Sequence, residues 1–184
     1  MKRAVLINGV PASGKSTVAA SLVAYLQTNS VMAIPLTLDV VKEALFNHVG
    51  TGDREHNRML GRASYEAIFS SIAAFPDEVV PVVDAWHGFQ PTEIVEQRLS
   101  MAKIERCVEI WCKVSPQCAA ERYRARADER RTGHPPASYA LELQALAEKA
   151  KPLGLGPVIE IDTERPLDQV RFARVLAHLA TSSF

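Results

Sequence analysis

The chain has 184 residues, of which 47% are hydrophobic and 23% charged, and its formal net charge is zero. This length suits one domain that buries its core without disulfides or metals, and the balanced charge argues against a dedicated nucleic-acid or membrane-surface binder. The three cysteines, Cys107, Cys112 and Cys118, form no CxxC pair, so we expect reduced thiols instead of a zinc or redox site. No apolar run approaches the roughly 20 residues that cross a bilayer, and residues 1–10 do not resemble a signal peptide, so we expect a cytoplasmic protein.

Apolar patterns along the chain predict alternating strands and helices. Short apolar runs predict strands at residues 4–7, 31–38, 79–83, 104–114 and 158–161. Helical spacing of apolar residues, together with capping signals at Ser115 and Ser138, predicts helices over residues 15–28, 40–46, 55–74, 91–102, 116 onwards, 138–149 and 167–180. Pro81 inside the third strand indicates an irregular or edge-facing position. The pattern predicts a single three-layer α/β domain over residues 1–184, with a five-stranded parallel sheet and ligands at the carboxyl ends of the strands.

A glycine-bounded loop joins the first predicted strand to the first helix. Its glycines, lysine and serine fit the GxxxxGK(S/T) spacing of a loop that cradles a nucleotide triphosphate. Backbone N–H groups and the positive end of the following helix would face the phosphates. We expect Lys15 to bridge the outer phosphates as a catalytic residue, and the Ser16 hydroxyl to ligate Mg2+, which prefers hard oxygen ligands. The predicted ATP-binding residues of this loop are Gly9, Pro11, Ala12, Ser13, Gly14, Lys15, Ser16 and Thr17.

Two aspartates follow predicted strands and are candidates for the chemistry. Asp39 comes after the second strand, where a base that accepts the acceptor's proton would lie opposite the γ-phosphate; the alternative is a helix N-cap. Asp84 ends the run Val82-Val83, a hydrophobic-then-acid pattern typical of a carboxylate that positions Mg2+ through water, with a cap or turn as the alternative. His87 beside it either faces the acceptor pocket or is structural.

An arginine-rich segment, at about residues 122–137, ends in residues that break helices and predicts a lid. Arg122, Arg126 and Arg130 recur every four residues, so we expect them on one helical face until the helix ends. They would either bind phosphate oxygens through guanidinium forks and exclude water, or form a solvated face paired with nearby acids. We assign Arg126 a catalytic role, and Arg122 and Arg126 to the nucleotide. Three further arginines, which bind an anionic acceptor or merely solvate a helix, stay unassigned: Arg54, Arg58 and Arg62.

Taken together, these residues resemble the small P-loop kinases, a group that includes gluconate kinase, shikimate kinase and chloramphenicol phosphotransferase, and in particular its AAA-type ATPase-like members. The loop at residues 9–17 is the most specific part of this resemblance, which also includes Asp39, Asp84, the arginine-rich segment and residues 154–162. The resemblance implies a five-stranded parallel sheet, ATP with Mg2+, Asp39 as a substrate-orienting base and a lid that carries Arg126. It does not identify the acceptor, because residues 53–58 match the gluconate kinase substrate loop poorly.

These features favour an ATP-dependent phosphotransferase that acts on a hydroxyl of a small metabolite, sugar acid or antibiotic, as a monomer or homodimer. No Asn-Lys-x-Asp or Asp-x-x-Gly motif is present, which argues against a GTPase, and Asp84 is followed by Ala-Trp-His where adenylate kinases carry Gly-Phe-Pro-Arg. The alternatives are a non-catalytic ATP-binding sensor whose residues 122–136 dock a protein partner, and a kinase that acts on a nucleotide or a nucleic-acid terminus.

Overall fold

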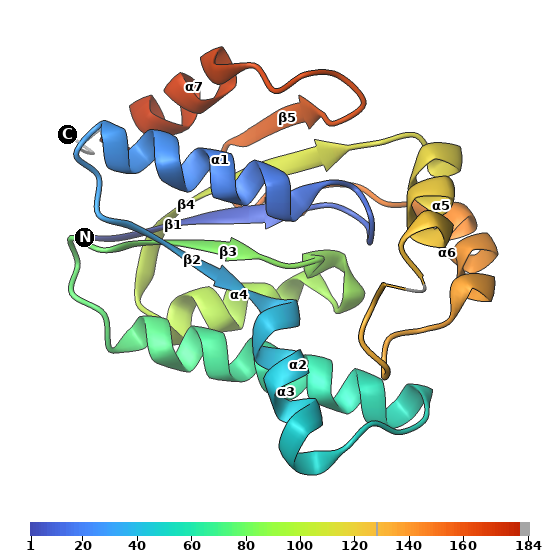
Figure 1. Cartoon of the computed structure of the whole chain (residues 1–184). Helices are drawn as coiled ribbons and strands as arrows, with labels where there is room; N and C mark the ends of the chain where they lie inside the picture. Colours follow the sequence, from blue (N-terminus) through green and yellow to red (C-terminus); the bar gives the residue numbers. More distant parts are fainter. Residues whose placement is uncertain (128, 181–184) are drawn as a thin grey trace.

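The computed structural model describes residues 1–127 and 129–180, and these form a sheet covered by helices (Figure 1). The sheet is parallel throughout, with the strand order β2-β3-β1-β4-β5. Its strands are β1 (Lys2–Asn8), β2 (Ala33–Thr37), β3 (Val80–Asp84), β4 (Ile104–Lys113) and β5 (Val158–Asp162). The predicted α/β fold with a five-stranded parallel sheet is therefore confirmed.

Helices occupy both faces of the sheet and the end of the molecule near the strands' carboxyl ends (Figure 1). One face is covered by α1 (Lys15–Thr28) and α7 (Gln169–Ala180), and the other by α3 (Arg54–Ala73) and α4 (Thr92–Met101). At the carboxyl ends lie α5 (Pro116–Ala125) and α6 (Ala140–Ala147), while α2 (Leu38–Val49) follows β2. Two short 3-10 helices, η1 (His87–Phe89) and η2 (Ala137–Tyr139), complete the described elements.

Each helical layer seals its own hydrophobic cluster against the sheet. On one face Val5 and Ile7 of β1 pack with Leu22 and Leu26 of α1, and Phe172 of α7 adds to the same cluster. On the other face Leu6, the intervening residue of β1, belongs to a cluster with side chains of α3 and α4. Because successive side chains of a strand point to opposite faces, the apolar run at residues 4–7 of β1 supports both layers. The central strand is thereby held rigidly where it enters the phosphate loop.

The structure departs from some of the local expectations and agrees with others. Pro81 lies in an internal strand, but the pairing of β3 with β1 begins only at Val82, so its missing N–H interrupts no bond of that ladder. Ser138 does not cap α6, which begins after η2 with Tyr139 at its N-cap and no side-chain cap. Ser115 does cap α5 by accepting a hydrogen bond from the Cys118 N–H. Among the described residues, no helix is long and apolar enough to span a membrane.

Candidate active site

The loop between β1 and α1 has a backbone that depends on its glycines. Gly9 has a φ of 145°, and a Cβ placed there would lie 2.5 Å from Ser13 Oγ and 2.9 Å from the carbonyl oxygen of Cys112. Gly14 has a φ of 83° and is the N-cap of α1, with no side-chain hydrogen bond to the cap. The first N–H groups of α1 are thus left open toward the loop, as an anion site at a helix N-terminus requires.

A buried polar network holds the start of this loop. The Oδ1 atom of Asn8 accepts hydrogen bonds from the N–H groups of Gly9 and His87, at 2.8 and 3.0 Å. Its Nδ2 donates to Oε1 of Glu109 on β4 at 2.7 Å, and the Glu109 carboxylate also accepts the N–H groups of Leu153 and Gly154. Neither Asn8 nor Glu109 was predicted, because Asn8 follows the first predicted strand, residues 4–7, and the burial of both side chains is visible only in the structure.

Lys15, Ser16 and Asp84 lie together beneath the loop. The Lys15 ammonium donates to the carbonyl oxygen of Val10 at 2.9 Å, and burial lowers the pKa of Lys15 although the Asp84 carboxylate opposes this. Asp84 is 3% exposed, and burial raises the pKa of its carboxyl, while Lys15 and a hydrogen bond with Ser16 oppose the rise. Its Oδ2 atom has no hydrogen-bond partner among the described residues. Asp84 is therefore the last residue of a strand and aims an unused oxygen into the site, rather than capping a helix.

These oxygens fit a magnesium site. A hydroxyl and a buried carboxylate are hard donors, and Mg2+ in nucleotide sites uses one or two protein ligands with phosphates and water supplying the rest. Within the described part of the chain, no group of three or more His, Cys, Asp or Glu side chains could hold a metal alone. The donor set of Ser16 and Asp84 thus suits a cation that arrives with a triphosphate.

Asp39 lies across the cleft, in the first turn of α2. The strand before it ends at Thr37, which is the N-cap of the helix, so Asp39 is neither the strand's last residue nor the cap. Its side chain is 51% exposed, and its Oδ2 atom is 3.4 Å from Nη2 of Arg130. The Arg130 guanidinium also stacks over the Tyr123 ring, with 5.2 Å between Cζ and the ring centroid. Arg130 is therefore the lid arginine nearest the candidate base.

The three lid arginines were expected on one helical face until the helix ends, and α5 ends at Ala125, so only Arg122 lies within it. Arg126 is the C-cap and Arg130 lies outside the helix. Arg122, on the last turn, donates to Oγ1 and the carbonyl oxygen of Thr163, which lies beside Gly14. Arg126 lines the cleft, whereas Arg122 does not. The nucleotide roles of Arg122 and Arg126 stay predictions.

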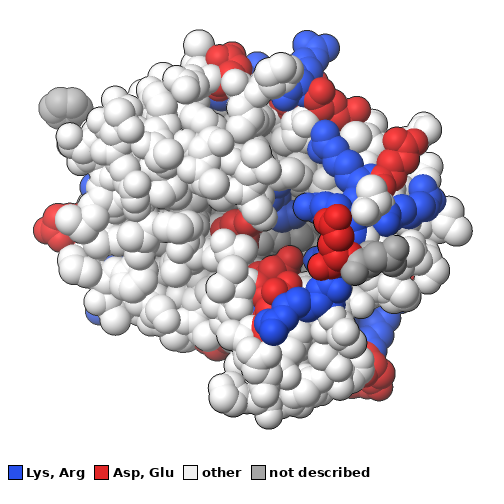
Figure 2. Space-filling view, in the orientation of Figure 1, with Lys and Arg blue, Asp and Glu red and all other residues white. Residues whose placement is uncertain are grey.

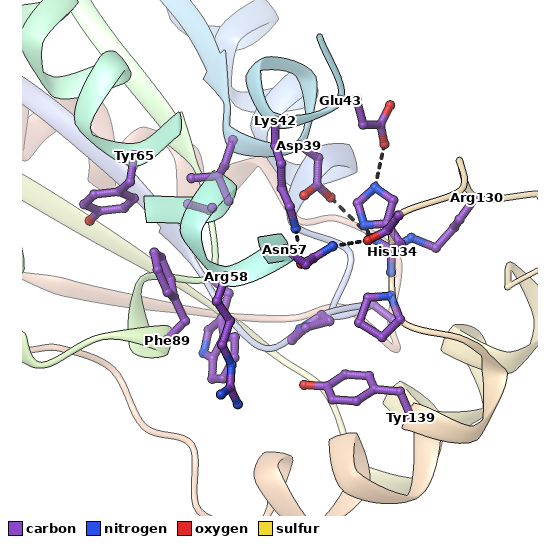
Figure 3. A pocket seen from close by; sticks show the side chains of 18 of the residues that line it. Asp39, Lys42, Glu43, Asn57, Arg58, Tyr65, Phe89, Arg130, His134 and Tyr139 are labelled. Carbon is purple, nitrogen blue, oxygen red and sulfur yellow. Dashed lines mark hydrogen bonds and ion pairs between the residues drawn. The ribbon is translucent and has the colours of Figure 1, made fainter. Parts of the chain in front are cut away.

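Residues 129–136, which we call the lid segment, rest on α2 and the start of α3 (Figure 3). His134 Nε2 lies 2.8 Å from Oε1 of Glu43. Asn57 donates to the carbonyl oxygen of Gly133 and accepts from Lys42 Nζ at 2.7 Å. Burial and then the charge of Arg130 lower the pKa of His134, which favours a neutral ring between Arg130 and Glu43. Sequence analysis missed Asn57 and Lys42, since neither belongs to a recognisable motif.

His87 is structural. It is fully buried, its Nδ1 atom lies 2.7 Å from the hydroxyl of Tyr65, and its Nε2 atom lies 3.4 Å from the carbonyl oxygen of Val83. Burial lowers the pKa of His87 to about 3, so the ring is neutral. Of the alternatives for this residue, the structure favours the supporting one, because Tyr65 and not His87 lines the cleft.

These groups surround one cleft of about 1510 Å³, far larger than a phosphate loop needs. Figure 2 shows charged side chains of both signs gathered around this hollow. The cleft runs from the phosphate loop past Asp39 and Asp84 to a far end between α3, η1 and η2. Arg54, Arg58 and Arg62 of α3 line the far end, and Arg54 forms an ion pair with Glu142.

Comparison with known proteins agrees with this geometry. Residues 5–150 match the protein family described as AAA domain. No curated protein matches the sequence. A presumed kinase from Chloroflexus aurantiacus is 24% identical with a TM-score of 0.79, and the alignment covers 96% of this chain and 98% of that one.

Two further solved structures share the fold. The APS kinase CysC of Mycobacterium tuberculosis, in complex with AMPPNP and APS, is 19% identical, with a TM-score of 0.63 and 98% of each chain covered. Kti12 of Chaetomium thermophilum, in complex with ADP-AlF3, is 17% identical, with a TM-score of 0.64 and coverage of 97% and 100%. Because the family match spans more than half of the sequence, the chain belongs to this AAA-domain family.

Proposed function

We propose that this P-loop chain is an ATP-dependent phosphotransferase that moves the γ-phosphoryl group of ATP to a hydroxyl of a small molecule. The observation that carries the proposal is the shared cleft. The phosphate loop, the buried Asp84 and the half-exposed Asp39 all line it, and it continues well beyond the space that the loop encloses. A site that binds only a nucleotide would not need the far end of this cleft, between α3, η1 and η2.

At the donor end, the chain binds and neutralises the triphosphate. The open N–H groups of α1 and the glycine loop would hold the phosphates, and the Lys15 ammonium would leave the Val10 carbonyl for a phosphate oxygen. Ser16 and Asp84 would hold Mg2+, which neutralises charge on the phosphate oxygens when bound. Arg126 would add a guanidinium from the end of α5.

At the acceptor end, Asp39 is the candidate base. In the transfer step the acceptor's oxygen forms a bond to the γ-phosphorus, the bond from that phosphorus to the bridging oxygen of ADP breaks, and Asp39 takes the hydroxyl proton. In this structure the Asp39 carboxylate is paired with Arg130, with 3.4 Å between Oδ2 and Nη2. The same pair must loosen for an acceptor to reach the carboxylate, so we expect lid movement in each turnover.

The test is a screen of sugars, sugar acids, aminoglycosides and phenicols for phosphorylation, followed by Asp39→Asn. We expect kcat to fall by about 10²–10⁴ while the Kd for ATP stays unchanged, since the residue acts on the acceptor's proton. Glu142→Gln is the matched control, because it removes a carboxylate from the same cleft without touching Asp39. Full transfer activity in the Asp39 variant would exclude it as the base. Tight ATP binding with no transfer to any acceptor would instead favour a nucleotide sensor.

A further inference from the structure

The far end of the cleft carries positive charge that the protein does not neutralise. Arg54 is paired with Glu142, and Arg98 is paired with Glu66 through an Nε to Oε2 distance of 2.7 Å. Arg58, one turn after Arg54 on α3, has no ion pair with any described carboxylate. Two acids that line the cleft here, Glu142 and Glu66, are thus already used by neighbouring arginines, whereas Arg58 is left to a ligand.

Arg58 is also placed to meet a ligand. It lines the cleft, and Figure 3 shows its side chain reaching from α3 into the open space between Phe89 and Tyr139. The Tyr139 hydroxyl is close enough for the charge of Arg58 to act on its pKa, although burial is the main cause of the raised pKa there. Arg62, one further turn along the same helix face, lines the cleft as well and has no ion pair with a described residue. Guanidinium groups on one face, four residues apart, suit an anion with several oxygens.

The walls beside these arginines are aromatic. Trp86 and Phe89 follow β3, and Tyr139 closes the opposite side from η2. Tyr65, held by its hydrogen bond to His87 and packed against Phe89, gives this wall a rigid backing. A site with apolar faces and two guanidinium groups that lack an ion pair with a described residue recognises a molecule that has a carbon body and an anionic group with several oxygens.

From this arrangement we infer that the acceptor is an anionic small molecule, a hydroxylated compound whose carboxylate, sulfate or phosphate group binds Arg58 while its hydroxyl faces Asp39. The inference rests on the proposed function and narrows its acceptor class. It assigns Arg58 to substrate specificity, a role separate from the nucleotide role predicted for Arg122 and Arg126. Neutral sugars and uncharged antibiotics are accordingly poor acceptors.

The first experiment sorts acceptors by charge. A small-molecule extract of bacterial cells is separated on an anion-exchange resin at pH 7, and each fraction is assayed for phosphoryl transfer from radiolabelled ATP to a small product. We expect the acceptor in the retained, anionic fraction. An acceptor confined to the neutral flow-through would overturn the inference but leave the proposed function intact, whereas no transfer in any fraction would overturn the proposed function.

The second experiment tests Arg58 directly, with Arg54 as a matched control on the same helix. We expect Arg58→Gln to raise the KM for the anionic acceptor by about tenfold to hundredfold, the usual effect of losing a charge-assisted hydrogen bond, with the KM for ATP unchanged. Arg54→Gln removes the same charge from a side chain that is already paired with Glu142 and that lies 6.0 Å from the centroid of the Tyr139 ring. Because this arginine is exposed and its charge is already paired, we expect the acceptor KM to change by about twofold or less. Equal effects of the two substitutions would show that Arg58 contributes only general positive charge, against the inference.

A third measurement does not depend on turnover. Phenylglyoxal modifies accessible arginines, and mass spectrometry maps the sites. With a non-hydrolysable ATP analogue bound, benzoate and phenyl phosphate should slow modification of Arg58, whereas benzamide should not. If neither anion protects Arg58, the cleft has no anion site at this residue, and the inference fails even where transfer is observed.

Discussion

The two ends of the cleft are built in different ways. At the donor end the phosphate loop is formed by backbone, with left-handed glycines, helix N–H groups and a buried network from Asn8 to Glu109. At the acceptor end the lid segment is held by side chains, through contacts such as Arg130 with Asp39 and His134 with Glu43. Backbone geometry resists substitution, while side-chain contacts can be exchanged one at a time. Substitutions therefore alter the acceptor end more readily than the donor end.

The largest expected effect comes from breaking the donor end. In Gly9→Ala the new Cβ would meet the carbonyl oxygen of Cys112 and the Ser13 side chain, and the φ of 145° would be strained for alanine. We expect a loss of about 2 kcal/mol or more in the free energy of unfolding, equivalent to a fall in Tm of roughly 4–8 °C, together with loss of ATP binding. Thermal unfolding and ATP titration measure both.

Gly61→Ala is the matched control for that substitution. Gly61 lies inside α3, and nothing lies within 4 Å of a Cβ built there. Alanine in a helix interior is preferred over glycine by up to about 1 kcal/mol, so this variant should be as stable as the wild type or more so. If Gly9→Ala were stable and bound ATP normally, the phosphate loop would not depend on glycine at this position.

A second prediction concerns the dependence of stability on pH behind the phosphate loop. Burial holds the pKa of His87 near 3, against 6.5 for an exposed histidine. Below pH 6.5, His87 is therefore protonated in the unfolded chain but stays neutral in the folded chain until the pH approaches 3. This residue's contribution to stability is complete above pH 6.5 and is lost as the pH falls toward 3, at about 1.4 kcal/mol per pH unit.

Denaturant unfolding at pH 7, 6, 5 and 4 measures that slope. We expect His87→Gln to flatten the loss of stability with falling pH relative to the wild type. His48→Gln, a substitution at an exposed position on α2, serves as the comparison and should retain the wild-type slope. If the free energy of unfolding of His87→Gln fell with pH as steeply as that of the wild type, burial of a neutral His87 would not be the cause of the pH dependence.

The smallest effect is expected at the acceptor end, in the lid segment. The Glu43 carboxylate forms a hydrogen bond with Nε2 of His134. Glu43→Gln replaces that carboxylate with a neutral amide and weakens the hydrogen bond, so the lid segment should open more often. We expect trypsin to cleave after Arg130 and Arg131 about fivefold faster, with little change in Tm, because local opening does not require global unfolding. Glu96→Gln, on α4, should cleave at the wild-type rate. Unchanged cleavage in Glu43→Gln would mean that this contact does not hold the lid.

The same contrast explains what could be predicted from sequence. The phosphate loop and the five strands were predictable because glycine spacing and apolar runs are local signals of backbone geometry. The position of Asp84 at the end of β3 was predictable from the apolar run before it, while its role as a magnesium ligand stays a prediction. The partner of Asp39 was not, because Arg130 reaches it only after α5 ends at Ala125, and that contact is set by tertiary packing. The support from Asn57 to Gly133 likewise joins residues 76 positions apart.

The strand order has a consequence for how the chain is made. β1 is synthesised first but lies in the middle of the sheet, where Val5 pairs with Val82 on one side and with Val108 on the other. Parallel neighbours so distant in sequence make such a sheet slow to form. During synthesis β1 gains its neighbour β3 first, and its other side stays without β4 until residues 104–113 have emerged from the ribosome. An apolar β1 exposed during that interval is the part of the nascent chain with the greatest need of protection by a chaperone.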